Sequence, residues 1–150
     1  LEVFEQDMVG VKGYDASILD ALTRHNVRIV SKVSNANTVT HYVDTSLKSL
    51  RRVETDLAER YPHAEIKTRK LSLVSVVGRD LSGLSVLQRG LESFANSGIY
   101  SVGASQGPRN VDTQFILERG DMAKAVKSLH DAFFDEEKAD GDKAKVALVA

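Results

Sequence analysis

The sequence predicts an α+β fold made of two ferredoxin-like βαββαβ units, each an antiparallel sheet with its helices on one face. Three observations indicate this fold. The 150-residue chain repeats its pattern of apolar periodicities at an offset of roughly 70 residues. Within each copy, strand-like alternation and helix-like spacing follow the order β-α-β-β-α, with or without a last strand. Each copy is also short, so two copies packed together would bury more surface than either copy alone.

The first copy begins with a strand and a helix. An apolar strand over residues 1–4 is followed by the glycine-containing loop MVGVKGYD (8–15). Ile18 and Leu22 then recur at helical spacing, and Asp15 is the predicted N-cap of that helix. The dipeptide HN closes it.

Two further strands, a second helix and a fourth strand complete the first copy. VRIVSKV (27–33) and NTVTHYV (37–43) alternate at period two and are joined by a polar junction. Apolar residues at helical spacing over 47–57 predict the second helix, with Pro62 just beyond its end. AEIKTRK (64–70) is the fourth strand.

The second copy follows the same order. Its elements are a strand, a loop, a helix stopped by Gly98, two strands, and a helix capped by Asp121. They lie at 71–77, 78–83, 84–97, 99–105, 111–118 and about 122–135. The predicted domains are residues 1–70 and 71–136. Residues 137–150 form a charged linker that ends in VALVA, which is either a strand returning to a sheet edge or a disordered end.

The composition excludes several classes of protein. The net charge is -1, with Lys and Arg spread along the chain, which argues against nucleic acid and anionic membranes as partners. The absence of cysteine excludes disulfides, thiolate nucleophiles and thiolate metal ligands. Apolar runs fall far short of the ~20 residues of a membrane helix, and no signal peptide is visible. We expect a cytoplasmic protein. Because the chain starts at Leu1, inside a predicted strand, we also expect a fragment of a longer one.

No catalytic or metal site is predicted. The sequence has no GxxxxGK[ST] loop, and GYDASI does not match a nucleophile elbow. The four histidines, His25, His41, His63 and His130, fall on different predicted elements without a metal-ligand spacing. We expect them at surface or boundary positions.

The loop before the first helix is a candidate ligand site. Gly10 and Gly13 allow positive φ and a close approach of the backbone to a ligand. The loop leads into a helix N-terminus, where unpaired N–H groups favour an anion such as an α-carboxylate. An ordinary strand-to-helix turn explains the same residues.

The polar junction SNANT (34–38) is the second part of this candidate site. We expect the first strand to lie beside the second, which would bring the loop close to Ser34 and Asn35. An Asn side chain both donates and accepts, so it can bind an ammonium or a carboxylate. The same residues are also typical of a hairpin turn.

Several motifs resemble a known family. RHNVRIV, LSLVSVVGRDLSG, GIYSVGASQG and AVKSLHDAFF, in this order, are similar to the tandem ACT domains at the C-terminus of bacterial aspartate kinases. The resemblance covers residues 1 to about 135. It implies a regulatory region that pairs into a homodimer through its sheets and binds an end-product amino acid, threonine or lysine. The kinase domain that converts ATP and L-aspartate to 4-phospho-L-aspartate is absent from this chain, and ATP and Mg belong to that domain. No cofactor is expected here.

The resemblance also implies effector-binding residues. By position they are Met8, Val11, Gly13, Tyr14 and Asp15 in the loop, and Ile29, Val30, Ser34 and Asn35 on the second strand. The sequence departs from the family pattern where DKPG becomes GVKG, where an Asp becomes Val30, and where a Gln-Asn pair becomes Ser34-Asn35. A lysine ammonium beside Val30 would lack a counter-charge, so threonine is favoured over lysine.

Three hypotheses follow. The first is an allosteric, amino-acid-sensing and dimerising region of an aspartate kinase. The second is an assembly module of the same fold without a small effector, in a feedback-relaxed isoform such as those of ectoine synthesis. The third, a ferredoxin-like nucleic-acid binder, is disfavoured by the 6% aromatic content and the net charge.

Overall fold

The computed structural model describes residues 1–134, and the chain divides into two compact units between Arg69 and Lys70. Each unit has its own sheet and its own hydrophobic core. This confirms the α+β class with ferredoxin-like units that the sequence predicts. The strand or disordered end predicted within residues 137–150 lies outside the described residues.

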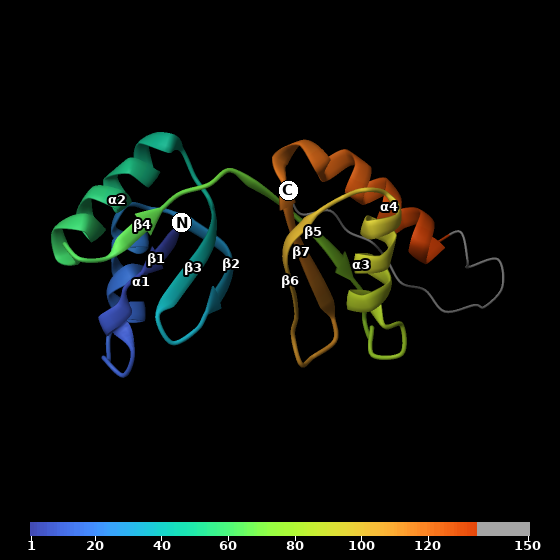
Figure 1. Ribbon diagram of the computed structural model, residues 1–150, viewed down its shortest axis with the longest axis horizontal. Helices are drawn as coiled ribbons and strands as arrows, with labels where there is room; N and C mark the ends of the chain where they lie inside the picture. The colour runs from blue at the N-terminus through green and yellow to red at the C-terminus, as the bar shows by residue number, and fades with distance from the viewer. Residues whose placement is uncertain (135–150) are drawn as a thin grey trace. The chain divides into compact units, whose positions relative to one another are not determined.

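The first unit has the full βαββαβ order, with two helices on one face of its sheet (Figure 1). Its elements are β1 (Glu2–Phe4), the 3-10 helix η1 (Gln6–Met8), α1 (Tyr14–Arg24), β2 (Arg28–Ser34), β3 (Thr38–Asp44), α2 (Leu47–Arg60) and β4 (Glu65–Lys67). The antiparallel sheet has the order β2-β3-β1-β4. The expectation that the first strand lies beside the second is therefore wrong, because β3 inserts between β1 and β2.

The core of the first unit lies between this sheet and its helices. Ile18 and Leu22 of α1 and Val53 and Leu57 of α2 are fully buried, as their helical spacing predicts. Each such side chain contributes about 1.5–3 kcal/mol when it leaves water. The same packing fixes α1, and with it the loop that precedes α1, over the sheet.

The second unit repeats this plan within the described residues. Its elements are β5 (Leu71–Val77), α3 (Val86–Asn96), β6 (Ser101–Gln106), β7 (Asp112–Glu118), the 3-10 helix η2 (Arg119–Asp121) and α4 (Met122–Phe134). The sheet order β5-β7-β6 matches β1-β3-β2 of the first unit. Its core is centred on Phe94 and Phe115, whose rings meet edge to face at 5.1 Å.

The two units share backbone features although their side chains differ. The turn after the first helix of each unit has a left-handed residue, Asn26 with φ 54° and Gly98 with φ 63°. The amide that follows each of them bonds back to the helix, at 2.9 Å and 2.8 Å. The next strand of each unit carries a β-bulge, at Val30 in β2 and at Val102 in β6. These matches establish which positions of the two units are equivalent.

A backbone hydrogen bond holds the first loop of each unit in place. The amide of Glu5, directly after β1, donates to the carbonyl of Asn37 in the β2–β3 hairpin at 3.0 Å. The equivalent amide of Gly78, after β5, donates to the carbonyl of Val111 at 2.9 Å. The loop after the first strand thus meets the hairpin, although the first and second strands are not neighbours.

Two predicted helix starts differ from the structure. Helix α1 begins at Tyr14 with Gly13 at the N-cap, so Asp15 is the second helical residue and not the cap. Helix α3 is shorter than the predicted range 84–97, because Ser85 adopts a left-handed conformation with φ 47° directly before it. Within residues 1–134, no helix has the length and apolar character needed to cross a membrane.

Candidate functional site

The loop between β1 and α1 forms the first wall of the candidate site. Met8, on the 3-10 helix, is buried in the core of the first unit, whereas Val9 and Val11 are exposed. Gly10 and Gly13 have φ of 78° and 99°, a conformation that glycine adopts without strain. Of the predicted loop residues, Met8 therefore serves packing, and Val11 and Gly13 face accessible space.

Tyr14 lies at the start of α1 between two partners. Its hydroxyl donates to Oε2 of Glu5 at 2.7 Å, and its ring stacks on Tyr61 at 4.5 Å. The hydrogen bond to the Glu5 carboxylate raises the pKa of Tyr14 to about 12. Glu5 is only 9% exposed. The sequence analysis missed Glu5, although an acidic residue directly after a core strand is a signal that could have found it.

The bulge in β2 determines which side chains face α1. Ile29 pairs with Val43, and after the extra residue Val30 the next pairs are shifted by one. Period-two alternation would place Val33 on the same face as Ile29. The shift instead places Lys32 opposite His41. This rearrangement explains why the sequence pattern did not indicate Lys32.

The hairpin places Ser34 and Asn35 near the loop, with different roles. Ser34 is exposed at the end of β2. The side-chain oxygen of Asn35 accepts hydrogen bonds from the amides of Asn37 at 3.1 Å and Thr38 at 2.9 Å. The Asn35 oxygen therefore stabilises the hairpin turn, and its NH2 group is the part that could contact a ligand.

A polar cluster of Asp15, Lys32 and His41 lies between α1 and the sheet. The ammonium of Lys32 is paired with the carboxylate of Asp15. His41 is fully buried, and neither of its ring nitrogens has a hydrogen-bond partner within residues 1–134. Burial, together with the Lys32 charge, lowers the pKa of His41. The expectation of a surface or boundary position is wrong for His41, because β3 is an inner strand and its odd-numbered residues face the helices.

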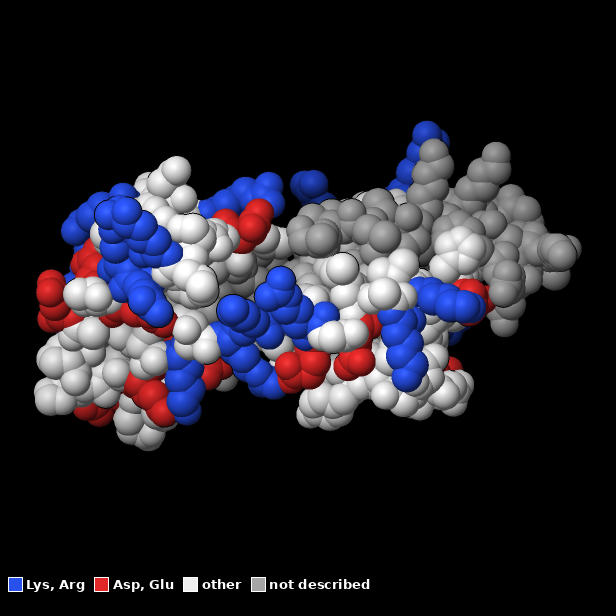
Figure 2. Space-filling view, turned by 90° about the horizontal axis from the view of Figure 1, so that it is seen from above, with Lys and Arg blue, Asp and Glu red and all other residues white. Residues whose placement is uncertain are grey.

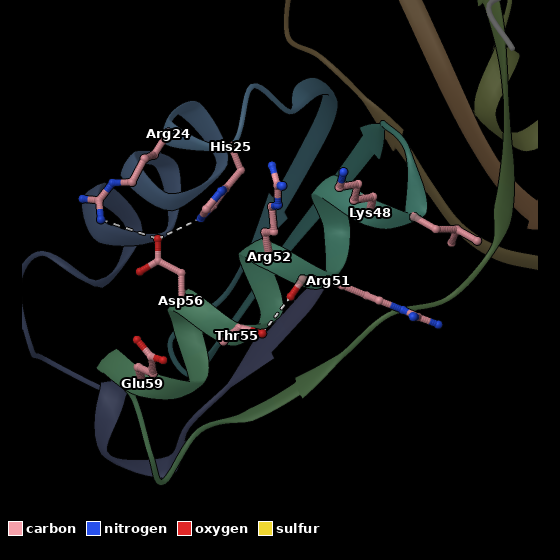
Figure 3. Close-up of a pocket in the computed structure, with 9 residues that line it drawn as sticks. Arg24, His25, Lys48, Arg51, Arg52, Thr55, Asp56 and Glu59 are labelled. Carbon is pink, nitrogen blue, oxygen red and sulfur yellow. Dashed lines mark hydrogen bonds and ion pairs between the residues drawn. The ribbon is translucent and has the colours of Figure 1, made fainter.

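A separate groove lies on the outer surface of α1 and α2. It has a volume of about 870 Å³ and contains none of the nine predicted effector residues. Its lining residues are Arg24, His25, Leu47, Lys48, Arg51, Arg52, Thr55, Asp56 and Glu59 (Figure 3). Figure 2 shows Lys and Arg atoms gathered over the α2 side of the first unit, with Asp and Glu atoms beside them.

Ion pairs at one end of this groove join the two helices. Asp56 of α2 accepts from Nε of Arg60 at 2.6 Å and lies 3.2 Å from Nε2 of His25. Burial acts to raise the pKa of Asp56, but the hydrogen bond and charge of Arg60 outweigh it and hold that pKa below its usual value. Much of the polar lining therefore serves helix packing.

The first unit thus brings together most of the predicted site residues. The loop, the start of α1 and the hairpin meet at one end of the sheet, while Ile29 and Val30 lie toward the other end of β2. This end of the sheet presents the paired Asp15 carboxylate and Lys32 ammonium, the Ser34 hydroxyl and the Asn35 amide. The described residues contain no group of three or more His, Cys, Asp or Glu side chains that could hold a metal ion.

Comparison with known proteins identifies relatives of this chain. No family model matches it. It is 34% identical over 137 residues to the aspartate kinase Ask_Ect of Stutzerimonas stutzeri, an alignment that covers 91% of this chain and 29% of that protein. The chain therefore spans less than a third of the length of this curated relative.

Several solved structures with the same fold belong to aspartate kinases. Aspartokinase III of E. coli, in complex with lysine and aspartate, matches with a TM-score of 0.71 and 20% identity, over 89% of this chain and 30% of that one. The regulatory subunit of aspartate kinase from Thermus flavus matches with a TM-score of 0.69 and 19% identity, over 88% of this chain and 90% of that one. At these identities the two structures show the shared fold.

Proposed function

We propose that this chain, a homologue of the C-terminal regulatory region of aspartate kinases, senses an amino acid and controls a kinase domain that lies outside it. The observation that carries this proposal is coverage: the alignment takes in 91% of this chain but only 29% of an aspartate kinase. The regulatory subunit from Thermus flavus, in contrast, is covered over 90% of its length. This coverage supports the matching part being the regulatory part, which we propose to be composed of two ACT domains.

The effector we propose is a small amino acid, with threonine favoured over lysine. The E. coli relative binds lysine. In this chain Val30 is apolar at the position where the family resemblance implies an acidic partner for the lysine ammonium. Ser34 offers an exposed hydroxyl at the end of β2, which suits the threonine side chain.

Dimerisation through the sheets is the second part of the proposal. β2 is an edge strand of its sheet, and it exposes the apolar side chains of Ile29 and Val33. An exposed edge with apolar residues is suited to pairing with a second copy. In the full protein, a cytoplasmic enzyme in this proposal, ATP and Mg would bind to the kinase domain and this region would need no cofactor.

Binding would act on the kinase domain by favouring one of its conformations. The effect can be no larger than the difference in effector affinity between the two conformations.

Calorimetric titration of the chain with L-threonine and L-lysine, with its mass in solution measured alongside, tests the proposal. We expect saturable threonine binding to a dimer and weaker binding of lysine. Ser34→Ala should weaken threonine binding about 3- to 10-fold, the effect of one lost hydrogen bond. Ser105→Ala, the same substitution on β6 of the second unit, is the control and should change nothing. Val30→Asp should strengthen lysine binding, because it supplies a counter-charge.

An assembly module without an effector is the alternative function. It is favoured by Asn35, whose side-chain oxygen is already bonded to the hairpin backbone. A well-folded dimer that binds neither amino acid would establish this alternative.

A further inference from the structure

Three equivalent positions are polar in the first unit and apolar in the second. The second residue of the first helix is Asp15 in α1 and Leu87 in α3. The second pair after the bulge is Lys32 with His41 in the first unit, and Ala104 with Phe115 in the second. The same backbone therefore carries two different sets of side chains at one place.

In the second unit Phe115 belongs to the core and Leu87 packs against that core, whereas Ala104 is exposed. Phe115 is fully buried, packs edge to face on Phe94, and lies directly over Gly90 of α3, where a Cβ would clash with its ring. Thr113, two residues before Phe115 on β7, is also buried, and its hydroxyl has no partner within residues 1–134, but no charged or ionisable group is buried at the three positions. This unit shows that the fold itself does not require a charged cluster here.

In the first unit the cluster leaves hydrogen-bonding capacity unused. His41 is fully buried, and both ring nitrogens lack a partner within residues 1–134. Lys32 stands directly opposite His41 in the sheet. Buried polar atoms are nearly always paired, so an unpaired imidazole beside a lysine indicates a group that binds there in another state of the protein.

We infer that Lys32 and His41 form a carboxylate subsite, in which Asp15 pairs with Lys32 in the free protein and gives way to the carboxylate of a bound amino acid. The Lys32 ammonium supplies the charge, and a ring N–H of neutral His41 supplies a hydrogen-bond donor. This inference rests on the proposed amino-acid-sensing function and names the group by which the ligand is recognised.

The exchange of carboxylates needs only a local rearrangement. The side chain of Asp15 is half exposed, at 50%, and that of Lys32 is 31% exposed. Asp15 follows the exposed loop that ends at Gly13, so rotation of its side chain would free the Lys32 ammonium, which lies opposite His41 in the sheet. Once rotated, Asp15 can accept the α-ammonium of the ligand. One internal ion pair is then replaced by two pairs with a zwitterion, and the net charge of the site is balanced.

The subsite would recognise the head group of the amino acid, and other residues would recognise its side chain. Lys32, His41 and Asp15 would hold the head group that all α-amino acids share. The choice between side chains would remain with residues such as Ser34 and Val30. Replacement of Lys32 should therefore weaken the binding of every α-amino acid by a similar factor.

Nitrogen NMR of His41 in the 15N-labelled chain tests the subsite directly, with sodium acetate, L-threonine and L-lysine as probes. We expect the ring nitrogens to shift with acetate and with threonine. Lys32→Gln should weaken both responses at least 10-fold. Asp15→Asn should strengthen the acetate response, because the competing carboxylate is gone, and should weaken threonine binding, because the ammonium loses its partner. Lys67→Gln, which breaks an exposed ion pair with Glu65, is the control.

The outcomes distinguish this inference from the proposed function. Threonine binding by calorimetry without any change at His41 would overturn the subsite and leave the sensor intact. A response of His41 to acetate, without calorimetric binding of threonine or lysine, would support the subsite and overturn the sensor. If none of the three probes shifts the ring nitrogens of His41 in a folded chain, the subsite is overturned. If Asp15→Asn weakens the acetate response as well as threonine binding, the subsite is also overturned, because Asp15 would then not compete with acetate for Lys32.

Discussion

The two units have the same chain path but place different chemistry between helix and sheet. The first unit has His41, Lys32 and Asp15 where the second has Phe115, Ala104 and Leu87. The turns, bulges and loop hydrogen bonds are the same in both. The difference shows that one backbone plan accommodates either set of side chains at these positions.

The helices of the two units are also joined by different groups. In the first unit Asp56 links α2 to α1 through His25, with Arg60 beside it. In the second unit, hydroxyl groups join α3 to α4: Ser93 donates to the carbonyl of Ser128 at 2.9 Å, and Ser97 lies 2.9 Å from the hydroxyl of Ser128. The second unit also has one charged contact between these helices, because Arg89 donates to the carbonyl of Ala132 at 2.6 Å and lies over the ring of Phe133. The first unit differs in that carboxylates pair with basic side chains between its helices.

The largest expected difference concerns the equivalent positions 115 and 41. Phe115→Ala should lower the free energy of unfolding by about 3–5 kcal/mol, since it removes a fully buried ring. His41→Leu should leave the stability of the first unit unchanged or raise it at neutral pH, because it removes two buried nitrogens that have no partner within residues 1–134. Urea unfolding with residue-level hydrogen exchange measures each unit separately.

Leu is the matched replacement at position 41, because Ile18 stands where the second unit has Gly90 and leaves no room for a phenyl ring. Equal losses in the two variants would mean that His41 is as necessary to its core as Phe115. The contrast between the units would then be one of packing alone.

A smaller difference concerns the residue before the first helix of each unit. Gly13→Ala should cost about 1–2 kcal/mol, because an L-residue is strained at positive φ although nothing obstructs its Cβ. Ser85 already carries this strain in the second unit. Ser85→Gly should therefore stabilise by less than about 1 kcal/mol, the gain being offset by the flexibility of glycine in the unfolded chain. Thermal unfolding of both variants measures the two effects, and a loss in Ser85→Gly would contradict the assignment of strain.

The smallest expected difference is in the response to acid. The groups that face His41 are Lys32, Asp15 and the amino group of Leu1, and burial is the first cause of its lowered pKa. The unfolded state therefore binds a proton more readily than the folded state. The first unit should lose stability as the pH falls below about 6.5, toward the lower pKa of the folded state. Above that pH this contribution is fully present.

The second unit has Phe115 at this position and should lack the effect. His41→Leu should make the first unit resemble the second in urea titrations at about pH 5.5 and 7.5, on either side of the usual histidine pKa. An unchanged pH dependence in this variant would show that another group is responsible.

The sequence indicated the fold because fold information repeats along the chain. Helical spacing at Ile18 and Leu22 and alternation in the strands are signals that recur in both copies. The candidate site was only partly predictable. The bulge at Val30 shifts the register by one residue, which turns Lys32 toward α1 against the period-two pattern. Sequence periodicity does not reveal a bulge, so the cluster of Lys32 and His41 was missed. Asn35 showed the opposite limit, since its residue type suits a ligand and a turn equally.

The bonds from Glu5 to Asn37 and from Gly78 to Val111 use only main-chain atoms. An amide N–H exists at every residue except proline, so substitutions in either loop cannot delete these bonds unless they introduce proline. After a duplication, one copy of the unit could therefore change its loop chemistry freely while the loop kept its place. Because the loop geometry does not depend on which side chains the loop carries, new ligand specificities could evolve without a loss of stability.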